Sequence, residues 1–206
     1  MKILALSDHV ADAIYSRNVR ERFGDIDLML SCGDLPYSYL EYAVTMLGVP
    51  AYYVHGNHDH PEYTDSGKTL KKPGGWFNVD NKVTYAKDLL IAGFEGSPRY
   101  KPDAPFQYTE EQMRRKVMRM IPALLFNRVR FGRFVDVLIT HAPPRGIHDG
   151  EDLPHRGFKV FRWFMARFQP RYMLHGHKHV YRPEATRTRY QSTMVVNVYP
   201  FTVIEF

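Results

Sequence analysis

Apolar runs and amphipathic segments alternate along the first part of the chain. The continuous apolar runs at 2–7, 28–31 and 51–54 predict buried β-strands. Apolar residues that recur every three or four positions at 14–23 and 37–47 predict helices. This alternation is typical of parallel strands joined by crossover helices.

The rest of the chain adds strands that are not all parallel. Residues 83–86 and 89–94 have strand character, and Lys87-Asp88 between them predicts a hairpin. The remaining predicted elements are an irregular stretch at 60–80, a long helix with Thr109 as N-cap and a kink at Pro122, a strand at 135–139, a helix at 158–168, a strand at 172–174 and two closing strands within 194–206.

Together these elements predict an α/β fold in which two mixed β-sheets form a sandwich flanked by helices. A chain of 206 residues can close one hydrophobic core, and no internal repeat or long Gly/Ser linker divides it. We therefore expect a single domain that spans residues 1–206.

Net charge, cysteine content and the lengths of the apolar stretches indicate which substrates and which cellular compartment suit the protein. The net charge of +6 would steer anionic substrates toward it. The single cysteine, Cys32, excludes an intrachain disulfide and suits a small buried hydrophobe. Because no apolar stretch is long enough for a signal peptide or a membrane span, we expect a cytoplasmic protein with no membrane partner.

Basic residues cluster at 114–133 and at 156–171. Such clusters most often form solvated helix faces, and we prefer that interpretation to a nucleic-acid surface.

Residue types that bind metal ions follow several predicted strands directly. Because parallel strands bring their carboxyl ends to one edge of a sheet, these side chains should meet there. The candidates are Asp8, Asp34, Asn57, His58, Asp59, His141, His177 and His179.

The mixture of ligand types predicts two divalent metal ions in a hydrolytic site. Two such ions can polarise a phosphoryl oxygen, activate a water and stabilise the leaving oxygen. Carboxylates from Asp8 and Asp34 would reduce the repulsion between the ions, while imidazoles favour Mn, Fe, Zn or Ni over Mg. In an extended segment His177 and His179 would share a face, so that each could serve one metal.

In order and placement these motifs resemble those of the calcineurin-like metallophosphoesterases, whose pattern is Asp-x-His, Gly-Asp, Gly-Asn-His-Asp, a later His and Gly-His-x-His. The resemblance runs from residue 4 to residue 179 and implies a four-layer αββα fold. It also implies that Asp34 bridges both metals. By the same resemblance one metal is completed by Asn57, His141 and His177, and the other by Asp8 and His179.

The resemblance assigns catalysis to the Asn-His-Asp segment. His58 would act at the scissile phosphate as general acid or charge stabiliser, oriented by Asp59. An imidazole can donate a proton to a leaving alkoxide near neutral pH, so the role is chemically sensible.

One motif departs from the family pattern. The family has His two residues after the first Asp, whereas here that position is Val10 and the histidine is His9. If the strand continued, His9 would point to the face opposite Asp8 and could ligate only through a bulge. We expect an open coordination position and weaker metal occupancy at the site of Asp8.

The leading hypothesis is a dinuclear metal-dependent phosphoesterase that hydrolyses a phosphomonoester or phosphodiester by attack of metal-bound hydroxide. Two alternatives stay open: a nucleic-acid or cyclic-nucleotide phosphodiesterase, and a non-catalytic scaffold that keeps the fold. Retention of the His58-Asp59 pair favours an enzyme, because a binding module has no need of a leaving-group acid.

Several other residues have structural interpretations that we prefer. His55 and His175 suit hydrogen-bonded core groups behind the metals. The Phe residues within 158–168 suit a core stripe. The loop 145–157 suits a solvated turn, with His155 as the best candidate for substrate contact.

Overall fold

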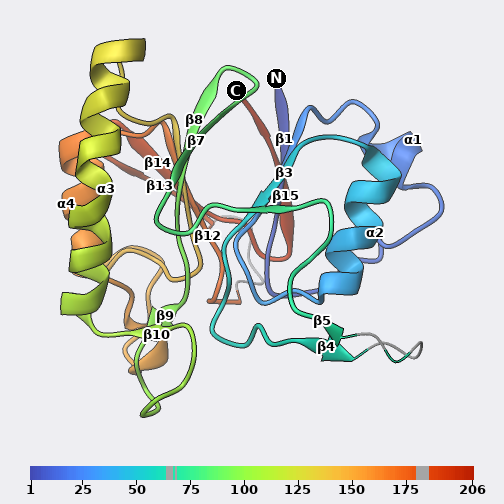
Figure 1. Ribbon diagram of the computed structural model, residues 1–206, viewed down its shortest axis with the longest axis horizontal. Helices are drawn as coiled ribbons and strands as arrows, with labels where there is room; N and C mark the ends of the chain where they lie inside the picture. Colours follow the sequence, from blue (N-terminus) through green and yellow to red (C-terminus); the bar gives the residue numbers. More distant parts are fainter. Residues whose placement is uncertain (64–66, 68, 180–185) are drawn as a thin grey trace.

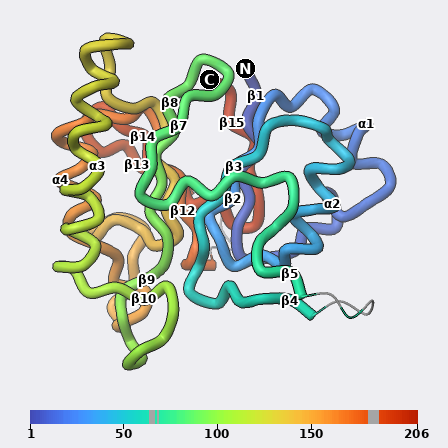
Figure 2. Tube along the Cα trace, in the orientation of Figure 1, coloured from blue at the N-terminus to red at the C-terminus, as the bar shows by residue number. Residues whose placement is uncertain are grey.

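The computed structural model describes residues 1–63, 67, 69–179 and 186–206. They form two β-sheets packed face to face, with a pair of helices on the outer side of each (Figure 1). Strand β15 pairs antiparallel with β1, so the first and last residues of the chain lie side by side (Figure 2).

The first sheet has the strand order β15-β1-β2-β3-β6. Its strands β1, β2, β3 and β6 are parallel, and β15 is antiparallel to β1. The bounds are β1 (Lys2–Leu6), β2 (Leu28–Ser31), β3 (Ala51–Tyr53), β6 (Phe77–Asn78) and β15 (Phe201–Glu205).

The second sheet has the order β13-β14-β12-β11-β8-β7. Its four central strands are parallel, and both edge strands are antiparallel to their neighbours. The bounds are β7 (Val83–Ala86), β8 (Leu89–Phe94), β11 (Val137–Thr140), β12 (Tyr172–His175), β13 (Arg187–Tyr190) and β14 (Thr193–Asn197).

The two sheets and the two pairs of helices form four layers, and a cluster of buried apolar side chains fills each of the three spaces between them. Helices α1 (Val19–Phe23) and α2 (Tyr37–Leu47) cover the first sheet, and α3 (Glu110–Phe131) and α4 (Lys159–Phe168) cover the second (Figure 1). In β1, Ile3 and Ala5 face the second sheet, whereas Leu4 and Leu6 pack under α1 and α2. A strand buried on both faces needs an unbroken apolar run. The structure confirms the four-layer αββα fold.

The short elements β4 (Glu62–Tyr63), β5 (Thr69–Leu70), β9 (Ser97–Pro98), β10 (Gln107–Tyr108) and the 3₁₀ turn η1 (Pro154–Arg156) lie in connections. The expectation that 60–80 is wholly irregular was wrong, because β6 adds a parallel strand beside β3. Strands of two residues are too short to produce a periodic signal.

Two predicted boundaries also change. The helix expected at 14–23 is shorter in the structure and runs only from Val19 to Phe23. Ile14 is buried in the core, but it lies in a turn before this helix. The strand expected at 135–139 runs instead from Val137 to Thr140.

Other local predictions are confirmed. The predicted hairpin at Lys87-Asp88 has positive φ at both residues, as its tight turn requires. Thr109 caps α3 in a capping box with Gln112, as predicted. The helix runs without interruption past Pro122, where the expected kink stays a prediction. Among the residues described, no helix combines the length and apolar character needed to cross a bilayer.

Candidate metal centre

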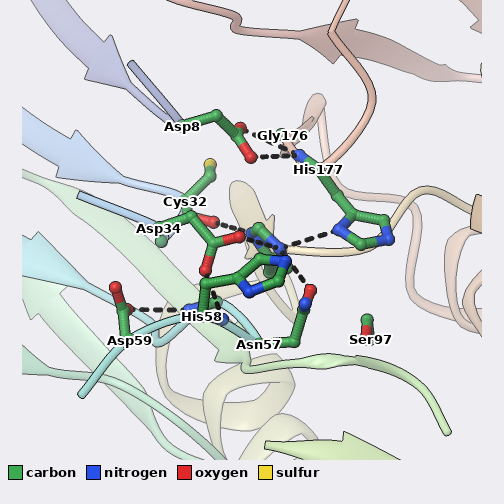
Figure 3. A network of polar contacts seen from close by, with 12 residues as sticks. Asp8, Cys32, Asp34, Asn57, His58, Asp59, Ser97, Gly176 and His177 are labelled. Carbon is green, nitrogen blue, oxygen red and sulfur yellow. Dashed lines mark hydrogen bonds and ion pairs between the residues drawn. The ribbon is translucent and has the colours of Figure 1, made fainter. Parts of the chain in front are cut away.

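The candidate ligands converge where strands of the two sheets end. Asp8 follows β1, Asp34 follows β2 and Asn57 follows β3, while His141 and His177 follow the parallel strands β11 and β12. Figure 3 shows Asp34, Asn57 and His177 directed toward one centre. Parallel pairing within each sheet therefore brings together residues that are far apart in sequence.

The Nε2 atom of His141 lies at the middle of this group. It is 3.0 Å from Asn57 Oδ1, 3.0 Å from His177 Nδ1 and 3.2 Å from Asp34 Oδ2. Candidate ligand atoms of Asp34, His141 and His177 all lie within 4.8 Å of one another. This spacing suits side chains that share a single metal ion.

Backbone carbonyls determine which imidazole nitrogens face the centre. His141 Nδ1 lies 2.8 Å from Cys32 O, and His177 Nε2 lies 2.9 Å from Pro154 O. A carbonyl can only accept, so each of these nitrogens carries a proton and donates it; whenever the ring is neutral, its other nitrogen is an acceptor. Two imidazole lone pairs and two side-chain oxygens then surround one point, which fits a cation.

The electrostatics of the centre also favour positive charge. Burial would raise the pKa of Asp34, but His141 outweighs it and lowers the pKa to about 2. Burial would lower the pKa of His141, but Asp34 and Asp8 raise it to about 9. Burial and the neighbouring His141 lower the pKa of His177 to about 3. In the metal-free chain a proton on His141 supplies the charge that a cation would bring, so metal binding should release it.

A second group adjoins the first. The side chain of Asp8 is 2% exposed, and its carboxylate accepts hydrogen bonds from the backbone N–H of His177 at 2.9 and 3.1 Å (Figure 3). His179 Nε2 lies 4.0 Å from Asp8 Oδ1. The His177 ring thus lies near Asp34 and the His179 ring near Asp8, although His177 has a φ of 67° and the segment is not extended as expected.

His9 does not approach this second group from a continuing strand. Strand β1 ends at Leu6, and Asp8 already has a left-handed φ of 62°. His9 is exposed, with its ring 6.3 Å from that of Tyr199, which stacks on His179 at 4.5 Å. The strand therefore does not continue through His9, and the argument that depended on its continuing does not apply. The open coordination position beside Asp8 stays a prediction.

The Asn-His-Asp segment forms a tight turn against Asp34. The backbone N–H of His58 donates to Asp34 Oδ1 at 2.8 Å, while the His58 residue is exposed. Asp59 Oδ2 accepts from the Gly56 N–H at 2.8 Å, so its described hydrogen bond closes the turn and does not involve the His58 ring. Burial and the nearby Asp34 raise the pKa of Asp59 to about 6.

Three groups that form hydrogen bonds with the candidate ligands were not predicted from the sequence. Tyr100 Oη accepts from Asn57 Nδ2 at 3.2 Å, which turns Asn57 Oδ1 toward His141. The other two are the carbonyls of Cys32 and Pro154. Backbone carbonyls carry no sequence signal, and Tyr100 lies outside every motif.

The loop 145–157 is less solvated than expected. His148 Nδ1 lies 3.0 Å from His175 Nε2, so this loop packs on the strand that leads to His177. The ring of His155 lies 4.7 Å from that of His177. His175 is fully buried, as a core group should be, and burial with His148 lowers its pKa to about 3.

Two hollows flank the cluster. One, of about 240 Å³, is lined by residues that include Asp34, Tyr37 and His58. The other, of about 490 Å³, is lined by residues that include His155 and His179. Both border candidate ligands, so each gives access to the centre from solvent.

The substitution Gly176→Ala tests the placement of Asp8, because it adds one methyl group beside the Asp8 side chain. A Cβ at this position would overlap the Asp8 carboxylate and the Ser7 side chain. We expect Gly176→Ala to displace Asp8, to lower the affinity of the second group for metal and to reduce stability by about 1–3 kcal/mol. Calorimetric metal titration and urea unfolding measure these effects. Gly74→Ala, where the nearest atom is the end of the flexible Glu41 side chain, is the matched control. Unchanged metal affinity would contradict the placement of Asp8.

Buried carboxylates and imidazoles at the edge of an αββα sandwich define this chain as a candidate metal-binding protein. Comparison with known proteins agrees, because the family model described as calcineurin-like phosphoesterase matches residues 1–181. The chain belongs to this family, which confirms the resemblance found in the motifs. Family membership and the ligand cluster support a metal-dependent phosphoesterase.

Individual relatives extend the comparison. An uncharacterized protein of Methanocaldococcus jannaschii, MJ1162, is 28% identical over 201 residues, which cover 88% of this chain and 81% of that protein. The crystal structure of TT1561 of Thermus thermophilus has a TM-score of 0.61 at 16% identity, covering 96% of this chain and 88% of that one. The structural likeness shows a shared fold.

Proposed function

We propose that this chain is a dinuclear metal-dependent phosphoesterase that hydrolyses a phosphomonoester or a phosphodiester. The observation that carries the proposal is the convergence of four acceptor atoms around one point, with the imidazole protons directed outward to the carbonyls of Cys32 and Pro154. An acceptor-only cluster is stable when a cation occupies it.

Each residue has a role in the proposal. Asp34 would help to hold both ions, with Asn57, His141 and His177 as further ligands of one ion and Asp8 and His179 as ligands of the other. Mn, Fe, Zn or Ni suit this mixture of carboxylate and imidazole. When bound, such ions would neutralise phosphoryl charge and lower the pKa of a water.

His58 protonates the leaving oxygen in this proposal. Its backbone is held by Asp34, while its exposed ring borders the hollow of about 240 Å³. The ring is therefore free to meet a substrate without being a ligand. Asp59 supports the role by closing the turn through Gly56.

Small phosphoesters are the favoured substrates. The arginine-rich segments belong to α3 and α4, in the outer helical layer, and the ligand cluster lies at the edge of the two sheets (Figure 1). A nucleic-acid substrate would need those cations beside the cleft. A cytoplasmic location and a single domain over residues 1–206 are further parts of the proposal, the former supported by the lone, buried Cys32.

The two ions should differ in affinity. The cluster around His141 has four ligands, whereas the group around Asp8 lacks the family's second histidine and retains the half-exposed His179. Calorimetric titration of metal-free protein with Mn²⁺ should resolve one tight and one weaker site. Two equally tight sites would contradict this assignment.

The proposal is tested by a phosphoester panel read together with metal content. Aryl phosphomonoesters, aryl phosphodiesters, cyclic nucleotides and oligonucleotides would be assayed with Mn²⁺, Fe²⁺, Ni²⁺, Co²⁺ and Zn²⁺. We expect metal-dependent turnover of small phosphoesters and little turnover of oligonucleotides. Absence of turnover with every metal would instead support a non-catalytic scaffold.

A further inference from the structure

The outer face of α3 exposes a continuous apolar stripe. Met118 is 37%, Leu125 48%, Phe126 65% and Val129 88% exposed. These positions follow helical spacing on the side opposite the buried residues Met113, Val117, Met120, Leu124 and Asn127. The stripe is about 16 Å long, from a rise of about 1.5 Å per residue. Contiguous exposed apolar residues of this kind mark an interaction surface.

Helix α4 extends the same face. Trp163 is 43% exposed, and with Met118 it borders a shallow hollow of about 450 Å³ between the two helices. Both helices form the outermost layer of the sandwich on this side (Figure 1). The exposed apolar side chains therefore belong to one face of the molecule, which we call the α3–α4 face.

Positive charge surrounds the apolar side chains. Helix α4 has no acidic residue, and the acids of α3 are Glu110 and Glu111 in its first turn. Glu110 accepts the backbone N–H groups of Lys159 and Val160, and Glu111 pairs with Arg115. The exposed cations of these two helices include Arg114, Arg119, Arg130, Lys159 and Arg167, whereas the Arg162 guanidinium lies over the ring of Tyr190 on β13.

We propose that the α3–α4 face binds the surface of an anionic lipid bilayer. Exposed Phe, Trp and Leu side chains bordered by arginines are the composition of helices that lie in a membrane interface. The cations would be attracted to the phosphate headgroups while the apolar side chains enter the acyl boundary. The expectation of no membrane partner rested on the lack of a spanning segment, which surface binding does not require.

Charge and shape favour a lipid surface over a second copy of the chain. Two α3–α4 faces would place arginines against arginines, because the two glutamates are already engaged. The most exposed side chains, Phe126 and Val129, project from the outward side of a helix. A planar, deformable anionic layer accepts such projecting side chains without needing a matching groove.

The test is co-sedimentation of the full chain with vesicles. We expect binding to vesicles of equal parts phosphatidylcholine and phosphatidylglycerol, weaker binding at high salt, and little binding to phosphatidylcholine alone. Light scattering of the protein without lipid would report its oligomeric state. Neither measurement uses phosphoesterase activity, so the outcome is separate from the proposed function.

Variants separate the two components of the surface. Phe126→Ser with Val129→Ser removes the apolar tip, and Arg119→Gln with Arg130→Gln removes charge; each pair should lower the partition coefficient by at least about tenfold. Phe77→Ser is the matched control, because Phe77 is 63% exposed but lies on β6 in the other sheet. Both pairs alter exposed side chains, so folding should be retained by circular dichroism.

Three results would overturn the proposal. The first is equal binding to neutral and anionic vesicles, or binding to neither. The second is a loss of binding in Phe77→Ser as large as in the paired variants. The third is a dimer that disappears in the Phe126→Ser and Val129→Ser variant, which would assign the face to a second copy.

Discussion

Asp34→Asn is expected to lower turnover of small phosphoesters by more than about 100-fold and to reduce metal content. Changes to the partners that merely orient metal ligands already cost about 10–100-fold in affinity or activity, and Asp34 is proposed as a direct ligand of both ions. One of its oxygens, Oδ2, lies 3.2 Å from His141 Nε2, and the other, Oδ1, accepts a hydrogen bond from the backbone N–H of His58. Metal analysis and kcat/KM measure the two effects.

Asparagine keeps the shape of Asp34 and an acceptor for His58, so the fold should survive. A variant that retained full metal content and full activity would remove Asp34 from the centre. A variant that lost activity but kept both metals would restrict its role to positioning His58.

The same variant has a pH-dependent effect on the metal-free protein. The pKa of His141, against which burial acts, is raised from 6.5 to about 9, with Asp34 as the largest cause of the increase. Charged His141 therefore stabilises the metal-free fold fully below pH 6.5, and this contribution is lost as the pH rises through about 9. Urea unfolding across this range should show that loss in the parent and a much smaller one in Asp34→Asn.

His58→Ala is expected to lower kcat by about 10²–10⁴-fold while metal content stays unchanged. The contact of His58 with the ligand cluster is its backbone N–H, which alanine keeps. Removal of the exposed ring therefore takes away a proton donor and leaves the metal ligands in place. A histidine with a merely structural role would not produce this result, in which turnover falls while metal content stays the same.

His9→Ala is the control for this variant. His9 is also an exposed histidine near the ligand cluster, but its described ring contact is with Tyr199. We expect turnover and metal content close to those of the parent. A large effect in His9→Ala, or none in His58→Ala, would reverse the two assignments.

The apolar pattern of the sequence was sufficient for the layers and for most strands. Strands such as β1 are buried on both faces, so their apolar runs are visible in the sequence without any knowledge of their neighbours. The two-residue strand β6 and the non-helical turn before α1 were missed, because neither has enough residues to establish a period.

The sequence by itself was sufficient to predict the candidate metal ligands and the strands that precede them, because ligand chemistry and strand periodicity are local properties. Only the tertiary structure decided which atoms face the centre. The carbonyl of Cys32, 109 residues from His141, orients that imidazole, and Pro154 orients His177. The tertiary structure also determines which face of α3 stays exposed to solvent. Contacts between distant segments depend on how whole elements pack, and no local pattern of residues records that packing.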